Sequence, residues 1–176
     1  MFNFPISISS FNKIDDNLII SIILKYLKNN KCCINYPKCN HPKEQSDPNV
    51  FKIKNKEIQK LKQSYFLFLN KLIGKYLIKE SKCWALYVKK ETTTPSIWHI
   101  HFDNKEQYKD CIQISGIYYL TDTDIGTEFN DYFFNIETKP KKGHWFIWDS
   151  RLNHRPKDCL NPKDRLIIAT QTILKK

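Results

Sequence analysis

The chain has 176 residues, of which 41% are hydrophobic and 27% are charged, enough for one folded domain with a single core. Four glycines and eight prolines exclude collagen-like and Pro/Gly-rich disordered classes. The longest apolar run, Leu18 to Leu24, is far shorter than the roughly 18 residues of a membrane helix and follows two aspartates. We therefore expect no membrane partner, no targeting segment and a cytoplasmic location.

The formal net charge of +11 raises the question of a polyanionic partner. Of the 29 basic residues only three are arginine, and the rest are lysine. Lysine, isoleucine and asparagine share AT-rich codons, and lysine is less suited than arginine to bidentate phosphate recognition. We favour a solvated, lysine-rich surface, and nucleic acid stays a possible but less favoured partner.

Three of the six cysteines lie close together in the sequence CCINYPKCNH. A cytoplasmic chain is not expected to form disulfides. Zinc sites usually show two pairs of ligands at short, regular spacing, whereas this group is irregular and has no second pair. We favour reduced cysteines in a loop, with a zinc site as the alternative; the residues concerned are Cys32, Cys33, Cys39 and His41.

The first half of the chain has the apolar spacing of helices. A helix is expected over residues 16–28, capped by Asp16, and a longer one over residues 56–78. The intervening residues 29–50 are rich in Asn, Lys, Cys and Pro and are expected to form a loop.

From about Cys83 onward, short β-rich runs alternate with turn residues. No helical pattern separates them, which indicates an antiparallel sandwich or barrel with the helices packed on one outer face. The expected strands are 84–88, 96–102, 112–120, 128–136, 144–148 and 165–173.

The segment WHIHFDN carries the chemistry of the second half. His101 and Asp103 are two residues apart, so on a strand they point to the same side. Together with the later His154 they form a set of two imidazoles and a carboxylate, the facial triad of non-haem Fe(II) oxygenases. His99 has the same spacing from His101 and is the alternative ligand. We favour Asp103, because a carboxylate partly neutralises the metal.

Four further elements follow this motif in order: SGIYYL (Ser115 to Leu120), GTEF (Gly126 to Phe129), FIWDSRLNH ending at His154, and Arg165. With them, residues 83–174 resemble the Fe(II)/2-oxoglutarate-dependent oxygenases, in particular the prolyl-4-hydroxylase-like branch. The resemblance implies a mainly β, α+β fold with a double-stranded β-helix core of the jelly-roll or cupin-like type. We expect one domain, 1–176, in which 1–82 is a helical support region and 83–176 the catalytic core.

The resemblance also assigns roles to individual residues. His101, Asp103 and His154 match the iron ligands of the family. Arg165 and Tyr119 match the residues that bind the distal carboxylate of 2-oxoglutarate, for which a guanidinium can donate two parallel hydrogen bonds. The other residues expected beside the cosubstrate are Tyr87, Ser115 and Thr170.

The implied activity is hydroxylation of an organic substrate with Fe(II), 2-oxoglutarate and O2, giving succinate and CO2 as co-products. By analogy with the branch, the first expected substrate is a prolyl residue in a protein or peptide, with a small molecule also possible. A nucleic-acid demethylase is the enzymatic alternative, which is less favoured because no arginine follows Arg165. The alternative from another class is a non-catalytic metal-binding β-barrel module.

Overall fold

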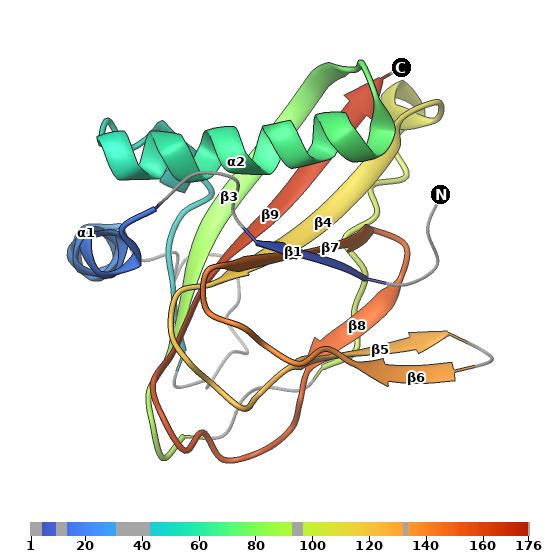
Figure 1. The fold of residues 1–176 in the computed structure, drawn as a ribbon. Helices are drawn as coiled ribbons and strands as arrows, with labels where there is room; N and C mark the ends of the chain where they lie inside the picture. Colours follow the sequence, from blue (N-terminus) through green and yellow to red (C-terminus); the bar gives the residue numbers. More distant parts are fainter. Residues whose placement is uncertain (1–4, 10–13, 31–42, 93–96, 132–133, 176) are drawn as a thin grey trace.

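Two antiparallel sheets and two helices make up the computed structural model, which describes residues 5–9, 14–30, 43–92, 97–131 and 134–175 (Figure 1). The larger sheet has the strand order β1-β7-β4-β9-β3-β2, and the smaller has the order β6-β5-β8. The strands of the larger sheet are β1 (Ile6–Ser9), β2 (Lys43–Gln45), β3 (Leu77–Val88), β4 (Ile112–Tyr119), β7 (His144–Asp149) and β9 (Arg165–Lys175). Those of the smaller sheet are β5 (Thr127–Asp131), β6 (Phe134–Glu137) and β8 (Asn153–Pro156).

The two helices begin and end at residues suited to those positions. Helix α1 (Asp16–Asn29) is capped by Asp15, whose side chain accepts a hydrogen bond from the Leu18 amide. Helix α2 (Lys56–Ile73) is capped by Asn55 and ends at Gly74, whose φ of 86° stops the helix five residues before the expected end. Short 3₁₀ turns, Val50–Lys52 and Glu106–Tyr108, precede α2 and β4.

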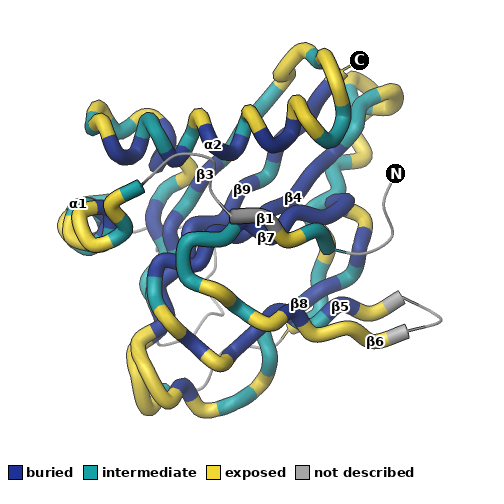
Figure 2. The backbone as a smooth tube through the Cα atoms, viewed as in Figure 1, coloured by how far each residue is buried: buried dark blue, intermediate teal, exposed yellow. Residues whose placement is uncertain are grey.

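Each face of the larger sheet packs against a different layer (Figure 2). On the helix face, Tyr65 of α2 contacts Trp145 of β7, with ring centroids 4.8 Å apart. The opposite face, called the inner face from here on, packs against the smaller sheet, where Phe129 of β5 contacts Trp148 of β7 at 5.0 Å. Because side chains alternate along a strand, each long strand contributes to both cores. The central strand β4 is accordingly buried over almost its whole length.

The fold class expected from the sequence is confirmed, with differences in individual elements. The structure adds β1, β2 and β8, and it divides the expected strand 128–136 into the hairpin β5–β6. Strand β3 begins at Leu77, so the region expected to be only helical contributes to the larger sheet. In the described part of the expected strand 96–102, only His99 forms a β-bridge, with His154.

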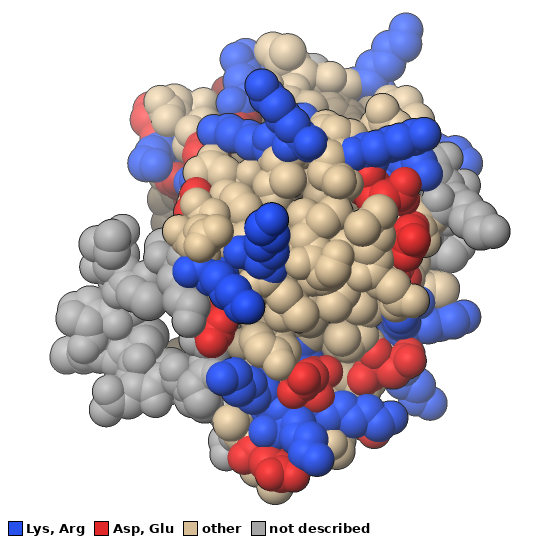
Figure 3. Space-filling view, turned by 90° about the vertical axis from the view of Figure 1, so that its left-hand side faces the viewer, with Lys and Arg blue, Asp and Glu red and all other residues tan. Residues whose placement is uncertain are grey.

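The charged side chains and the helices of the described part of the chain bear on the expected partners. On the face drawn in Figure 3, lysine and arginine side chains lie scattered among acidic and uncharged ones rather than in one continuous patch. In the described part of the chain, no helix has the length and apolar character needed to cross a membrane.

Candidate active site

Three imidazoles converge between the two sheets. His154 lies in β8, and His99 and His101 lie on the segment that runs beside β8. The amides of His99 and His154 each donate to the other's carbonyl oxygen at 3.0 Å, and the His101 amide donates to the Ser150 carbonyl oxygen at 3.0 Å. One ring nitrogen from each histidine lies within 4.8 Å of those of the other two. This spacing suits a single metal ion.

Hydrogen bonds fix the tautomers of two of these rings. The Nδ1 atom of His99 lies 2.8 Å from the Ile97 carbonyl oxygen, and that of His154 lies 2.9 Å from the Leu152 carbonyl oxygen. A carbonyl oxygen only accepts, so each Nδ1 carries the proton. The Nε2 lone pairs are then available for a metal, an arrangement typical of histidine ligands.

Burial keeps two of the imidazoles neutral. Desolvation, with a smaller contribution from His99, lowers the pKa of His101 to about 4. The pKa of His154 falls well below its usual value for the same main reason, with the neighbouring imidazoles adding to the shift. Only a neutral imidazole can donate a lone pair, so both rings are in their metal-binding form at neutral pH.

Asp103, expected as the carboxylate ligand, does not belong to this group of three. Its Oδ2 atom pairs with Lys105 Nζ at 2.9 Å, and its Oδ1 atom accepts from the Lys105 amide at 3.1 Å. These bonds to Lys105 are the main reason that the pKa of Asp103 is lowered. The structure thus brings together His101, His154 and the alternative residue His99.

Arg165 is a buried cation on the inner face. It begins β9 and is only 2% exposed, and its guanidinium lies 5.7 Å from the centre of the Tyr119 ring. No carboxylate among the described residues pairs with it, and its Nε atom has no hydrogen-bond partner there. A buried guanidinium without a counter-ion is costly. It is therefore suited to an anionic ligand.

An apolar floor separates the three histidines from Arg165. On the inner face, Ala169 lies opposite Ile117, and Ile167 lies opposite Tyr119. Gln171, the next residue of β9 on this face, donates from its side chain to the His101 carbonyl oxygen. Along the inner face of β9, Arg165 is therefore followed by an apolar stretch and then by Gln171, which binds the segment that carries the histidines. This order suits a short ligand with an apolar middle and an anionic end.

The other expected cosubstrate residues divide between the two faces of the larger sheet. Tyr119 and Ser115 are buried on the inner face, where Tyr119 Oη lies 3.2 Å from Thr127 Oγ1 and Ser115 Oγ lies 2.9 Å from Ser150 Oγ. Tyr87 and Thr170 alternate to the helix face. The Tyr87 hydroxyl donates to Asp164 at 2.9 Å, and the Thr170 hydroxyl donates to the Gly116 carbonyl oxygen at 3.4 Å. Strand alternation thus keeps Tyr87 and Thr170 away from the histidines.

Two further features belong to the surroundings of the histidines. The Trp148 ring lies 4.9 Å from that of His154, and its buried Nε1–H has no partner among the described residues. The side chain of Gln113 hydrogen-bonds to both the amide and the carbonyl oxygen of Asp103. Sequence reasoning missed Gln113, because its contacts with Asp103 depend on which segments are neighbours and leave no sign in a spacing pattern. The expected alternative zinc ligands, residues 32, 33, 39 and 41, lie outside the described residues.

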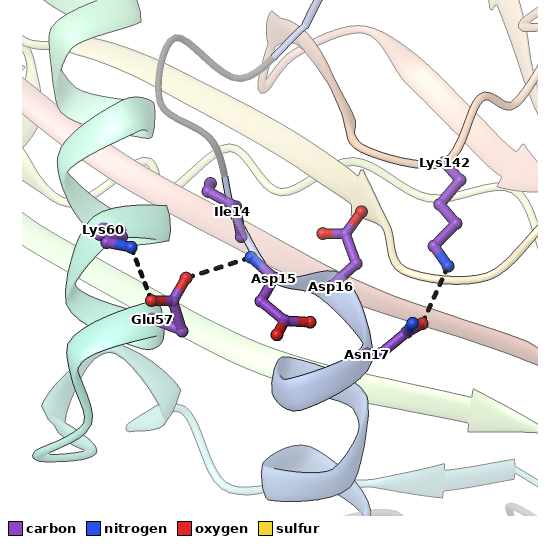
Figure 4. A pocket seen from close by; sticks show the side chains of 7 residues that line it. All are labelled: Ile14, Asp15, Asp16, Asn17, Glu57, Lys60 and Lys142. Atoms are coloured by element: carbon purple, nitrogen blue, oxygen red, sulfur yellow. Dashed lines mark hydrogen bonds and ion pairs between the residues drawn. The ribbon is translucent and has the colours of Figure 1, made fainter.

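An open hollow of about 510 Å³ lies on the helix side of the larger sheet, at the start of α1 (Figure 4). Asp16, one of its lining residues, accepts a hydrogen bond from the hydroxyl of Tyr118 at 2.8 Å. Of its other charged side chains, Lys60 pairs with Glu57 at 2.7 Å, and Lys142 donates to the Asn17 side chain at 3.3 Å. The hollow is thus separated by the larger sheet from the three histidines.

No protein-family model and no curated protein sequence matches the chain. Solved structures match it over nearly its whole length. A prolyl hydroxylase from Trichoplax adhaerens, in complex with a hypoxia inducible factor peptide, is 14% identical with a TM-score of 0.66, covering 97% of this chain and 83% of that one. The viral collagen prolyl hydroxylase of Paramecium Bursaria Chlorella virus-1, in its 2-oxoglutarate complex, is 19% identical with a TM-score of 0.60, covering 98% and 96%.

A third match performs different chemistry. It is a non-haem, α-ketoglutarate-dependent carbocyclase from nogalamycin biosynthesis, 10% identical with a TM-score of 0.71, covering 97% of this chain and 79% of that one. At these identities the likeness concerns the fold. The chain therefore has the double-stranded β-helix fold that is shared by prolyl hydroxylases and other 2-oxoglutarate-dependent Fe(II) oxygenases.

Proposed function

We propose that this protein is an Fe(II)- and 2-oxoglutarate-dependent oxygenase whose metal ligands are His99, His101 and His154. The observation that carries the proposal is the convergence of three imidazole nitrogens within 4.8 Å, on the side of the larger sheet that also holds Arg165, whose guanidinium pairs with no described carboxylate. Imidazole suits divalent iron, and three ligands leave coordination positions open. The fold likeness to enzymes of this class supports the same assignment.

The proposed cosubstrate site lies between the histidines and Arg165. Arg165 would bind the distal carboxylate of 2-oxoglutarate, and Tyr119 would line the same end of the site. Ala169 and Ile167 offer an apolar surface to the methylene groups. Three imidazoles contribute no negative charge to a divalent cation, so an anionic chelating cosubstrate complements this ligand set.

When bound together, Fe(II) and 2-oxoglutarate activate O2 and supply the oxidising power for hydroxylation, with succinate and CO2 as co-products. The protein's own residues position the reactants and exclude water. Phe129 and Trp148 pack around the His154 ring, with centroids 5.9 and 4.9 Å away. Such packing restricts the orientation of the ligand and keeps the centre dry.

We further propose a prolyl residue in a protein or peptide as the substrate. Support comes from the prolyl hydroxylases among the structural matches, one of them in complex with a peptide. The carbocyclase has a higher TM-score, so the fold by itself does not select a substrate. The test is incubation with proline-containing peptides, in which a product heavier by one oxygen atom must depend on 2-oxoglutarate.

The first experiment is an anaerobic titration of metal-free protein with Fe(II) and 2-oxoglutarate. We expect the visible charge-transfer band of chelated 2-oxoglutarate in the wild type. It should be lost in His99→Ala and retained in Asp103→Ala. Loss of the band in Asp103→Ala but not in His99→Ala would return the ligand assignment to the carboxylate. Bound iron without any band in the wild type would favour a non-catalytic metal-binding module.

A further inference from the structure

In the described part of the segment that carries His99 and His101, only His99 forms a β-bridge, but hydrogen bonds hold the backbone at both histidines. At His99 the partner is the backbone of β8, and at His101 it is the Ser150 carbonyl oxygen on one side and the Gln171 side chain on the other. Beyond His101, the side chain of a second glutamine, Gln113, binds the backbone at Asp103.

Gln113 makes the same pair of bonds that a neighbouring strand would make. Its Oε1 atom accepts from the Asp103 amide at 2.8 Å, and its Nε2 atom donates to the Asp103 carbonyl oxygen at 2.7 Å. Because a backbone amide only donates and a carbonyl only accepts, the orientation of the side-chain amide is fixed. Gln113 is 2% exposed, so its side-chain amide is shielded from competing water.

The backbone of Gln113 also holds the opposite side of the site. Its carbonyl oxygen accepts from the Ser150 amide at 2.9 Å, and the Ser150 carbonyl oxygen in turn accepts from the His101 amide. One residue of β4 thus joins the two chain segments that flank the histidines. The backbone positions of Asp103 and His101 are therefore coupled through it.

The two segments are attached at different positions along the larger sheet. Gln113 is opposite Ile173, near the end of β9 and far from Arg165, whereas His101 is bonded to Gln171, two residues closer to Arg165. Held over Gln113, Asp103 directs its carboxylate to Lys105 instead of the histidines. Strand alternation alone would allow Asp103 to join them.

We infer that Gln113 is a positioning residue that keeps the Asp103 carboxylate away from the metal and so fixes a ligand set of three imidazoles. The inference rests on the proposed metal site and concerns how its ligands are selected. Without Gln113, the backbone of Asp103 loses both hydrogen bonds. Its carboxylate can then leave Lys105 and bind a divalent cation instead. The ligand set would then include a carboxylate.

The test uses Co(II), whose visible absorption reports the number and type of ligands. Four full-length proteins are compared: wild type, Asp103→Asn, Gln113→Leu and the double variant. We expect Asp103→Asn to keep the wild-type spectrum and Gln113→Leu to shift it. The shift should disappear in the double variant, because it requires the carboxylate. Gln107→Leu, at an exposed glutamine in the same connection, is the matched control and should keep the wild-type spectrum.

The other outcomes separate the inference from the proposed site. A wild-type spectrum in Gln113→Leu, or a shift that persists in the double variant, overturns the role of Gln113 and leaves the histidine site standing. A changed spectrum in Asp103→Asn means that Asp103 is already a ligand, which overturns both. Absence of Co(II) binding by the wild type refutes the metal site itself. If Gln113→Leu does not fold, Gln113→Asn, whose shorter amide cannot reach Asp103, is read by the same criteria.

Discussion

The three histidines of the site contact one another, and burial keeps His101 and His154 neutral. Their rings lie 4.4 to 5.1 Å apart, so protonating one disfavours protonation of the others. Burial acts in the same direction at His101 and His154. The same neutrality that permits the cluster also keeps its lone pairs available to a metal.

The metal-free protein should lose stability as the pH falls below about 6.5. In the unfolded chain a histidine takes up a proton near that pH, whereas burial holds the pKa of His101 at about 4 in the folded state. Between these values the unfolded state binds more protons, so the free energy of unfolding falls by about 1.4 kcal/mol per pH unit for His101 alone.

Urea unfolding between about pH 7.5 and 5 measures this dependence while most carboxylates stay ionised. A His101→Asn variant should show a shallower slope than the wild type. His144→Asn, at a histidine outside the group, should retain the wild-type slope. An equal slope in His101→Asn and wild type would contradict the prediction.

Arg165→Met should separate ligand binding from stability. The variant loses the buried guanidinium, so we expect the dissociation constant for 2-oxoglutarate to rise at least about 30-fold, equivalent to roughly 2 kcal/mol. Because no described carboxylate pairs with Arg165, the ligand-free variant should be no less stable than the wild type. Anaerobic calorimetry with the Fe(II)-loaded protein and urea unfolding give the two values. Unchanged affinity would contradict the cosubstrate assignment.

At the scale of elements, α2 is the main cover of the helix face. Its buried residues recur at helical spacing and include Ile58, Leu61, Tyr65 and Phe68, whereas Leu67 points outward. The sequence pattern predicted this helix and its buried side correctly. The pattern ran on to Ile78 because Leu77 and Ile78 are apolar, but the positive φ at Gly74 ends the helix and these two residues begin β3.

Two leucines of α2 provide a matched test of this packing. Leu61→Ala, at a fully buried position, should lower the free energy of unfolding by about 2–5 kcal/mol. Leu67→Ala, where the side chain is 48% exposed, should change it by about 0.5 kcal/mol or less. Both variants make the same change in helix propensity, so the difference between their urea midpoints reports burial alone. Equal costs would contradict the observed orientation of α2.

At the scale of the whole molecule, residues from both halves of the chain build the larger sheet. Strand β1 pairs with β7, and β2 pairs with β3, so the N-terminal part supplies both edge strands as well as the two helices. Residues of α1 and α2 form one core with residues of β4, β7 and β9. We therefore predict a single cooperative unit.

A fragment of residues 77–176 should not fold by itself. Without the helices, the helix face would expose large side chains such as Tyr118, Trp145 and Ile168, all fully buried in the intact protein. We expect no near-ultraviolet circular dichroism and no cooperative unfolding transition, whereas the full chain should show one calorimetric transition. A cooperative transition in the fragment would show instead that the second half is an independent domain.

The sequence by itself determined the fold class, both helices and most of the long strands, and it singled out His101, His154 and Arg165 as candidate site residues. These features follow from local periodicity and from motif order, which a linear pattern records. Only the tertiary structure shows that His99, and not Asp103, lies in one group with His101 and His154, because their spacings from His101 are equal. This grouping goes together with contacts across the sheet, where Gln113 binds the backbone of Asp103 and β8 binds that of His99. Tyr87 and Thr170 were placed on the helix face for the same reason, since the register of β3 and β9 assigns each side chain to its face.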